Sequence, residues 1–113
     1  MRIYLPTTLA LLAEQHAAGA VLVPDGAVVA EDDSEDAEYA ALMTAADASA
    51  VQLAGAGRRV VVVADLAAEP AVGAAVPWRE VVAVHADVED RPAGADPDED
   101  LAWFATQEVP DLF

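Results

Sequence analysis

The chain is 113 residues long and carries 21 aspartates and glutamates against five arginines, which gives a formal net charge of −16 at pH 7. It has no lysine and no cysteine, so disulfide bonds, thiol nucleophiles, thiolate metal ligands and a catalytic lysine are excluded. A field this negative repels nucleic acids and anionic lipid, and it attracts cationic proteins or metal ions. We therefore expect one cytoplasmic domain that makes no direct contact with nucleic acid or with a membrane.

The N-terminal segment predicts a strand followed by a helix. Residues 2–5 alternate between polar and apolar side chains up to Pro6, as a strand does. Thr7 or Thr8 can cap the helix that follows, because a hydroxyl at this position accepts a bond from a free backbone N–H. The helix should end at Gly19, a residue suited to the left-handed position after a helix end.

A hairpin and a long helix are expected next. Residues 21–23 and 27–29 are apolar and flank residues 24–26, whose Pro-Asp-Gly sequence is typical of a tight turn. Ser34 is a suitable N-cap, and the carboxylates behind it favour the positive end of the helix dipole. Apolar residues then recur at helical spacing, so the second helix should run until Gly55.

Two strands rich in valine follow. Residues 60–64 are apolar on both faces, and residues 80–85 form the next strand. A loop is expected between them at residues 67–78. Arg58 and Arg59 stand at the start of the first of these strands, where we expect solvated edge charges.

This order of elements predicts an α+β fold. It matches the βαββαβ order of the ferredoxin-like sandwich, with an extra strand and a short C-terminal helix. The two helices are expected to cover one face of the sheet and to leave the other face open. Because valines 60–63 and 81–84 build part of that open face, the C-terminal segment or a second copy of the chain should cover it.

The chain divides into a core domain at residues 1–88, an acidic linker at residues 89–100 and an aromatic segment at residues 101–113. The linker is rich in carboxylates, proline and glycine, which is typical of a mobile segment. Residues 96–99 resemble a capping box, so a short helix should run through Leu101 and the aromatic residues after it.

The aromatic segment holds both phenylalanines and one of the two tryptophans of the chain. Its candidate residues are Trp103, Phe104, Leu112 and Phe113. We expect them to be buried by docking on the chain's own sheet. Capture by a protein partner is the alternative, since aromatic residues are enriched at interaction hot spots.

Motifs for metal binding and cofactor binding are weak. Asp96, Asp98 and Asp100 have the spacing of a calcium loop, but Leu101 and Gln107 stand where that loop needs glycine and glutamate. The Gly-Ala-Gly sequence at residues 55–57 follows a helix and precedes a strand, which is the reverse of a dinucleotide fingerprint. We therefore expect no metal and no cofactor.

His85 and Asp87 form the one pair that could support catalysis. They lie two apart on a predicted strand and so share a face, and a carboxylate beside an imidazole is how a general base or a pH switch is built. The only serines, Ser34 and Ser49, are not placed as nucleophiles, and the chain has no G-x-S-x-G or Walker sequence. A non-enzymatic protein is therefore the expectation.

Four short, mostly apolar segments stand at residues 1–6, 58–65, 77–87 and 101–113. These segments resemble a family of small uncharacterised actinobacterial proteins. The resemblance implies a soluble bacterial protein of unknown function, and it supplies no catalytic or binding residue.

Composition and patterning together favour a domain that acts by protein–protein contacts, either as a homodimer or by capture of a basic partner protein. Two alternatives remain open. The first is a small-molecule sensor, since ferredoxin-like domains often bind metabolites. The second is an acidic mimic of nucleic acid, in which carboxylates take the place of phosphates.

Overall fold

The computed structural model describes residues 1–54 and 56–113 and has a mixed α+β fold. In chain order, its elements are β1 (Arg2–Thr7), α1 (Leu9–Ala18), β2 (Ala20–Leu22), β3 (Val28–Val29), α2 (Glu35–Gln52), β4 (Val60–Asp65), β5 (Ala75–Pro77), the short 3₁₀ helix η1 (Trp78–Glu80), β6 (Val81–Ala86), β7 (Ala102–Phe104) and the 3₁₀ helix η2 (Thr106–Leu112). The predicted α+β class is confirmed.

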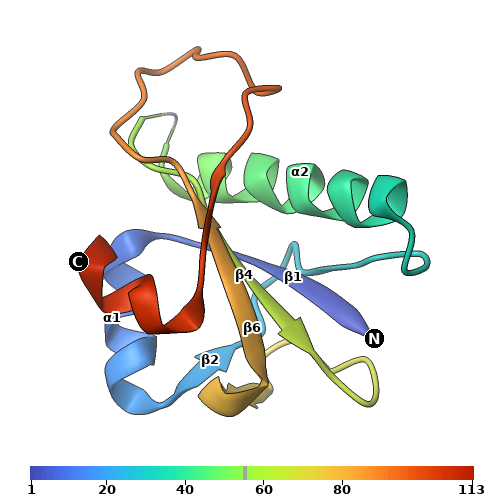
Figure 1. Cartoon of the computed structure of the whole chain (residues 1–113). Coiled ribbons are helices and arrows are strands. Elements are labelled where there is room, and N and C mark those ends of the chain that lie inside the picture. Colours follow the sequence, from blue (N-terminus) through green and yellow to red (C-terminus); the bar gives the residue numbers. More distant parts are fainter. Residues whose placement is uncertain (55) are drawn as a thin grey trace.

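A five-stranded sheet with the order β3-β1-β4-β6-β7 runs through the middle of the molecule (Figure 1). In the described part of the chain its neighbouring strands are all antiparallel, with β4 at the centre between β1 and β6. Antiparallel neighbours are also found in a ferredoxin-like sheet, but that fold carries both helices on one face, so the ferredoxin-like topology is not confirmed by the helix positions described next.

The strand β4 is buried on both faces, as its run of valines predicts. Val60 and Val62 pack with α1, whereas Val61 and Val63 pack with α2, because successive side chains point to opposite faces. The two helices therefore cover opposite faces of the sheet (Figure 1). The expectation that both helices lie on one face is wrong, because a valine run buried on both sides requires a cover on each side.

A small second sheet completes the α1 side of the core. The strand β2 pairs with β5, with Val21 opposite Val76, and both side chains are buried. The strand β3 pairs instead with β1. The predicted hairpin is therefore wrong: residues 24–26 do turn the chain, but the two strands separate and join different sheets. The predicted loop at residues 67–78 also contains β5, whose valine supplies part of this core.

Both helix starts follow the sequence signals. The hydroxyl of Thr8 accepts a hydrogen bond from the backbone N–H of Leu11 at 3.3 Å, and the hydroxyl of Ser34 accepts one from Ala37 at 3.1 Å. Gly19 follows α1 with φ of +80°, the left-handed conformation expected of it. The predicted end of α2 at Gly55 lies outside the described residues, and the helix itself ends at Gln52.

Ser49 joins α2 to the two central strands. Its buried hydroxyl donates to the carbonyl oxygen of Thr7 at 2.7 Å and accepts from the backbone N–H of Val60 at 2.9 Å. One side chain thus satisfies two backbone groups at the end of the β1–β4 ladder.

We expect Ser49→Ala to lower the free energy of unfolding by about 1–3 kcal/mol, because it removes the hydrogen-bond partner of a buried donor and of a buried acceptor. Thr44→Ala, at an exposed position on the same helix, should change it by less than about 0.5 kcal/mol. Urea unfolding of both variants measures the difference. Equal losses in the two variants contradict this role of Ser49.

Candidate functional site

The segment predicted as a short helix through Leu101 is an edge strand instead. Its strand β7 pairs with β6, with Phe104 opposite Val84 and Trp103 opposite His85. The helix prediction is wrong because aromatic side chains fit a pleated surface well and β6 offers a free edge. The helical turn comes later, as η2.

Pairing as a strand sends the candidate aromatic residues to different faces of the sheet. Phe104 and Leu112 pack against the α1-side core beside Val109, which is fully buried. Trp103 points to the opposite face and is 60% exposed, so the expected burial of this side chain is wrong. Phe113 lies against the ring of His16 and is 51% exposed, so its expected burial is wrong as well. The four residues do not form one surface.

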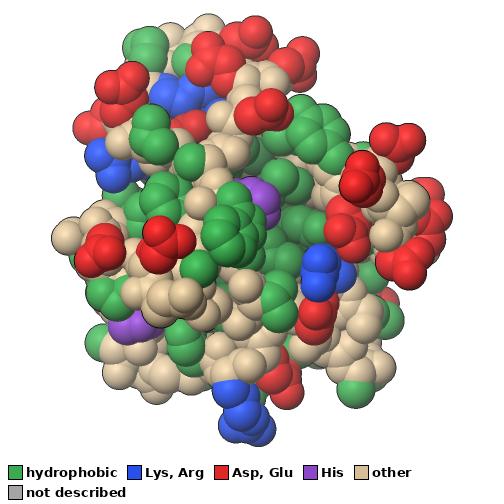
Figure 2. Space-filling model, in the orientation of Figure 1, with side chains coloured by type: hydrophobic (Ala, Val, Ile, Leu, Met, Phe, Trp, Pro, Cys, Tyr) green, Lys and Arg blue, Asp and Glu red, His purple; other side chains and the backbone are tan. Residues whose placement is uncertain are grey.

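A groove of about 300 Å³ lies on the α2 side of the sheet, beside the exposed Trp103. The helix α2 packs mainly on β1, β3 and β4, and the sheet extends beyond it through β6 and β7. The groove is lined by Arg2, Tyr4, Glu35, Glu38, Tyr39, Leu42, Val63, Val82, Ala83, His85 and Trp103. Figure 2 shows hydrophobic side chains gathered in a hollow of this face, with carboxylates along its rim.

Two polar contacts fix the walls of the groove. The Arg2 guanidinium donates to both carboxylate oxygens of Asp65, at 2.8 and 2.9 Å, and lies 3.6 Å from Glu38. These hydrogen bonds hold the pKa of Asp65 below its ordinary value. The second contact is made by Tyr39, whose hydroxyl donates to Asp100 at 2.8 Å, and this bond raises the pKa of the phenol. The contact ties α2 to the chain that leads into β7.

His85 and Asp87, the pair considered for catalysis, serve separate parts of the structure. His85 lines the groove opposite Trp103, where burial lowers the pKa of the imidazole and so favours its neutral form. Asp87 follows the end of β6 and binds Arg59. His85 is therefore part of the surface of the groove, whereas Asp87 has a structural role as the partner of Arg59.

Arg59 and Asp87 form a buried ion pair. The backbone N–H and Nε of Arg59 both donate to one carboxylate oxygen at 2.9 Å, and Nη2 donates to the other at 2.8 Å. The guanidinium also donates to the carbonyl oxygens of Pro97 at 3.2 Å and Glu99 at 2.9 Å. Arg59 is only 2% exposed, so the expectation of a solvated edge charge is wrong. No local sequence pattern predicts this ion pair, because Arg59 and Asp87 lie 28 positions apart in the chain.

Two opposing effects set the pKa of Asp87. Burial acts to raise the pKa, but the hydrogen bonds from Arg59 outweigh it and hold the pKa below its ordinary value of 3.8. A carboxyl group with a lowered pKa in the folded state stabilises the fold above its unfolded pKa. That contribution is lost as the pH falls through the folded pKa.

Asp87→Asn should therefore lower the free energy of unfolding by about 3–5 kcal/mol at pH 7, because the buried guanidinium loses its counter-charge. The deficit relative to the wild type should shrink as the pH falls below 3.8. Urea unfolding across a pH series measures it. Glu69→Gln, which removes one exposed carboxylate, is the matched control, and a deficit independent of pH contradicts the account.

Comparison with known proteins places the whole chain in one family. A family model described as "Family of unknown function (DUF6912)" matches residues 1–113. No curated protein and no solved structure matches the chain. The resemblance to a family of unknown function is thus confirmed. In the described part of the structure, no helix has the length and apolar character needed to cross a membrane.

Proposed function

Because the chain belongs to this family of unknown function, DUF6912, we propose its function from its surface: it is a non-enzymatic domain that binds a cationic segment of a partner protein. The segment lies in the groove between α2 and the strands β6 and β7. Trp103 is the anchor of the contact, and the surrounding carboxylates select the partner.

The observation that carries this proposal is the apolar surface of β6 and β7 beyond the cover of α2. Single exposed apolar residues are ordinary on a protein surface. Here Trp103, Val82 and Tyr39 are all exposed and line one groove together with Ala83 and His85. Apolar surface gathered in a concave site with a polar rim is typical of a binding site.

The charge of the chain favours a basic occupant. Glu35 and Glu38 stand on the α2 wall, and Asp98 and Asp100 lie beside the Tyr39 hydroxyl. With a net charge of −16 on each chain, two copies meeting through this face would repel each other. A basic partner gains from the same field, both in its rate of encounter and in the cation–π contact that Trp103 offers. Capture of a basic partner is therefore preferred to a homodimer.

Two alternative functions, a mimic of nucleic acid and an enzyme, account less well for the geometry of the groove. A mimic of nucleic acid needs carboxylates in place of phosphates and has no use for an apolar floor. An enzyme needs a base beside a nucleophile or an oriented water. In the groove, His85 lies between apolar and aromatic side chains, while Asp87 is held by Arg59. These features support binding in preference to catalysis.

A library of short peptides, in which one leucine or phenylalanine is flanked by arginines and lysines, tests the proposal. Trp103→Ala should weaken binding of the selected peptides at least about tenfold, as expected of a hot spot. Phe113→Ala is the matched control, because it removes another half-exposed aromatic ring, one that lies outside the groove, and should leave the affinity unchanged. Isothermal titration calorimetry gives both affinities.

Salt provides the second arm of this experiment. Binding should weaken as ionic strength rises, since the rim charges are exposed to solvent. Two results contradict the proposal: equal loss of binding in the two variants, or equal binding of peptides in which acidic residues replace the basic ones.

A further inference from the structure

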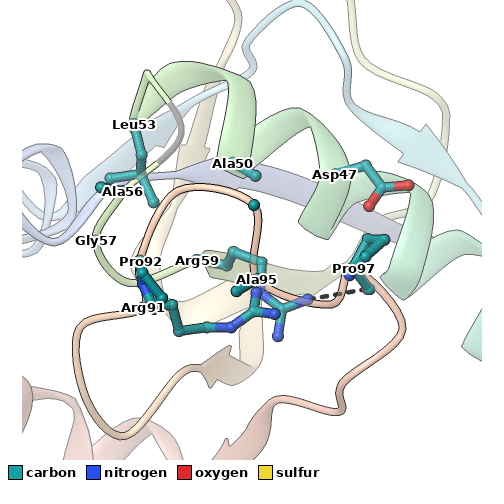
Figure 3. A pocket seen from close by; sticks show the side chains of 11 residues that line it. Asp47, Ala50, Leu53, Ala56, Gly57, Arg59, Arg91, Pro92, Ala95 and Pro97 are labelled. Atoms are coloured by element: carbon teal, nitrogen blue, oxygen red, sulfur yellow. Dashed lines mark hydrogen bonds between the residues drawn. The ribbon is translucent and has the colours of Figure 1, made fainter.

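A second cavity, of about 160 Å³, lies at the other end of α2 and shares no residue with the groove. It lies between the last turns of α2, the turn that precedes β4 and the loop at residues 91–97 (Figure 3). Its lining consists of Asp47, Ala50, Leu53, Ala56, Gly57, Arg59, Arg91, Pro92, Gly94, Ala95 and Pro97. Two of the five arginines of a strongly acidic chain therefore line one small cavity.

The two arginines differ in how far their donors are used. Arg59 makes four side-chain hydrogen bonds to Asp87 and to the carbonyl oxygens of Pro97 and Glu99. This leaves it little capacity for a ligand, because a guanidinium has five N–H donors. Arg59 therefore contributes a fixed positive charge to one wall of the cavity.

Within the part of the chain that the structure describes, the side chain of Arg91 makes a single hydrogen bond, so most of its N–H donors lack an acceptor. Its backbone pairs with Gly57, which holds the residue at the cavity, and its side chain is 13% exposed. Among the described residues, Nη2 donates to the carbonyl oxygen of Asp96, while the buried Nε has no hydrogen-bond partner. Nη1 forms an ion pair with Asp87 at 3.9 Å and Nε forms one with Glu99 at 3.7 Å, both longer than a hydrogen bond. The charge of Arg91 is thus compensated, but its N–H groups still lack hydrogen-bond acceptors, which favours a further acceptor at this side chain.

The cavity determines which acceptor fits. A carboxylate matches the planar fork of a guanidinium with two parallel hydrogen bonds. Most of the other walls are small and apolar, so the rest of the ligand must be apolar too. The volume is close to the ~150 Å³ of a cavity that holds benzene. A dianion such as phosphate is disfavoured, because Asp87 and Glu99 lie near both guanidinium groups and Asp47 lies near that of Arg59.

From these features we propose that the cavity binds a small organic monocarboxylate, with its carboxylate on Arg91 and its apolar body against Ala50, Leu53 and Pro92. Figure 3 shows the two arginine side chains approaching each other beneath α2, with the alanines and Leu53 around the remaining space. The proposal is independent of the function assigned to the groove.

Benzoate and 3-methylbutanoate are the probes, titrated into the full chain and followed by backbone amide NMR shifts and by the melting temperature. Both should give saturable shifts at Gly57 and Ala95 and raise the melting temperature. Benzyl alcohol, which has a similar shape and no charge, should give neither effect. Inorganic phosphate should not compete.

Three variants separate a site from a general effect of charge. Arg91→Gln should weaken benzoate binding at least about tenfold, whereas Arg79→Gln, which removes an exposed arginine, should leave it unchanged. Since Arg91 also contacts its own loop, Ala50→Leu is the third variant: it keeps the guanidinium and fills the space for the apolar body, so benzoate binding should be lost. The proposal is overturned if neither probe gives a saturable shift, if phosphate displaces benzoate, or if Arg91→Gln or Ala50→Leu binds benzoate as the wild type does.

Discussion

The buried ion pair between Arg59 and Asp87 is the constraint on which both candidate sites depend. It joins the start of β4 to the end of β6 and, through the carbonyl oxygens of Pro97 and Glu99, holds the segment that leads into β7. That segment carries one wall of the cavity, and the strand behind it carries Trp103 to the edge of the groove. A buried pair can add little net stability, but it specifies where the chain lies. We infer that specification is its main role here.

The exposed apolar surface of β6 and β7 results from the unequal coverage of the two faces of the sheet. On the α1 side, the helix, the small sheet and η2 together bury the core. On the α2 side, a single helix covers three strands, and the apolar surface of β6 and β7 remains beside a rim of carboxylates. In the function that we propose, the high net charge disfavours association of this surface with its own copies. The same charge favours a basic partner as the occupant of the groove, so the acidity and the exposed apolar surface would act together.

Local chemistry made part of this structure predictable. The caps at Thr8 and Ser34 rest on side chains and backbone groups a few residues apart, so the sequence pattern identifies them. The valines of β4 likewise indicate a strand buried on both faces. Pairings between distant segments carry no such signal. The strands β2 and β3 look like a hairpin and Arg59 looks like a surface charge, because in each case the partner lies far along the chain. Trp103 looks like a core residue because the face to which it points is decided by the pairing of β7 with β6, which no local pattern shows.

The most direct test of this account is hydrogen exchange in the double variant Arg59→Met/Asp87→Leu. Replacing both charges with apolar side chains avoids an unpaired buried charge, so the β1–β4 ladder should keep its protection. The tether to residues 97–99 is lost, and the amides of β7 should then exchange at least about tenfold faster than in the wild type. Unchanged protection at Trp103 and Phe104 contradicts the claim that the ion pair positions β7, and so does an equal loss of protection in β4 and β7.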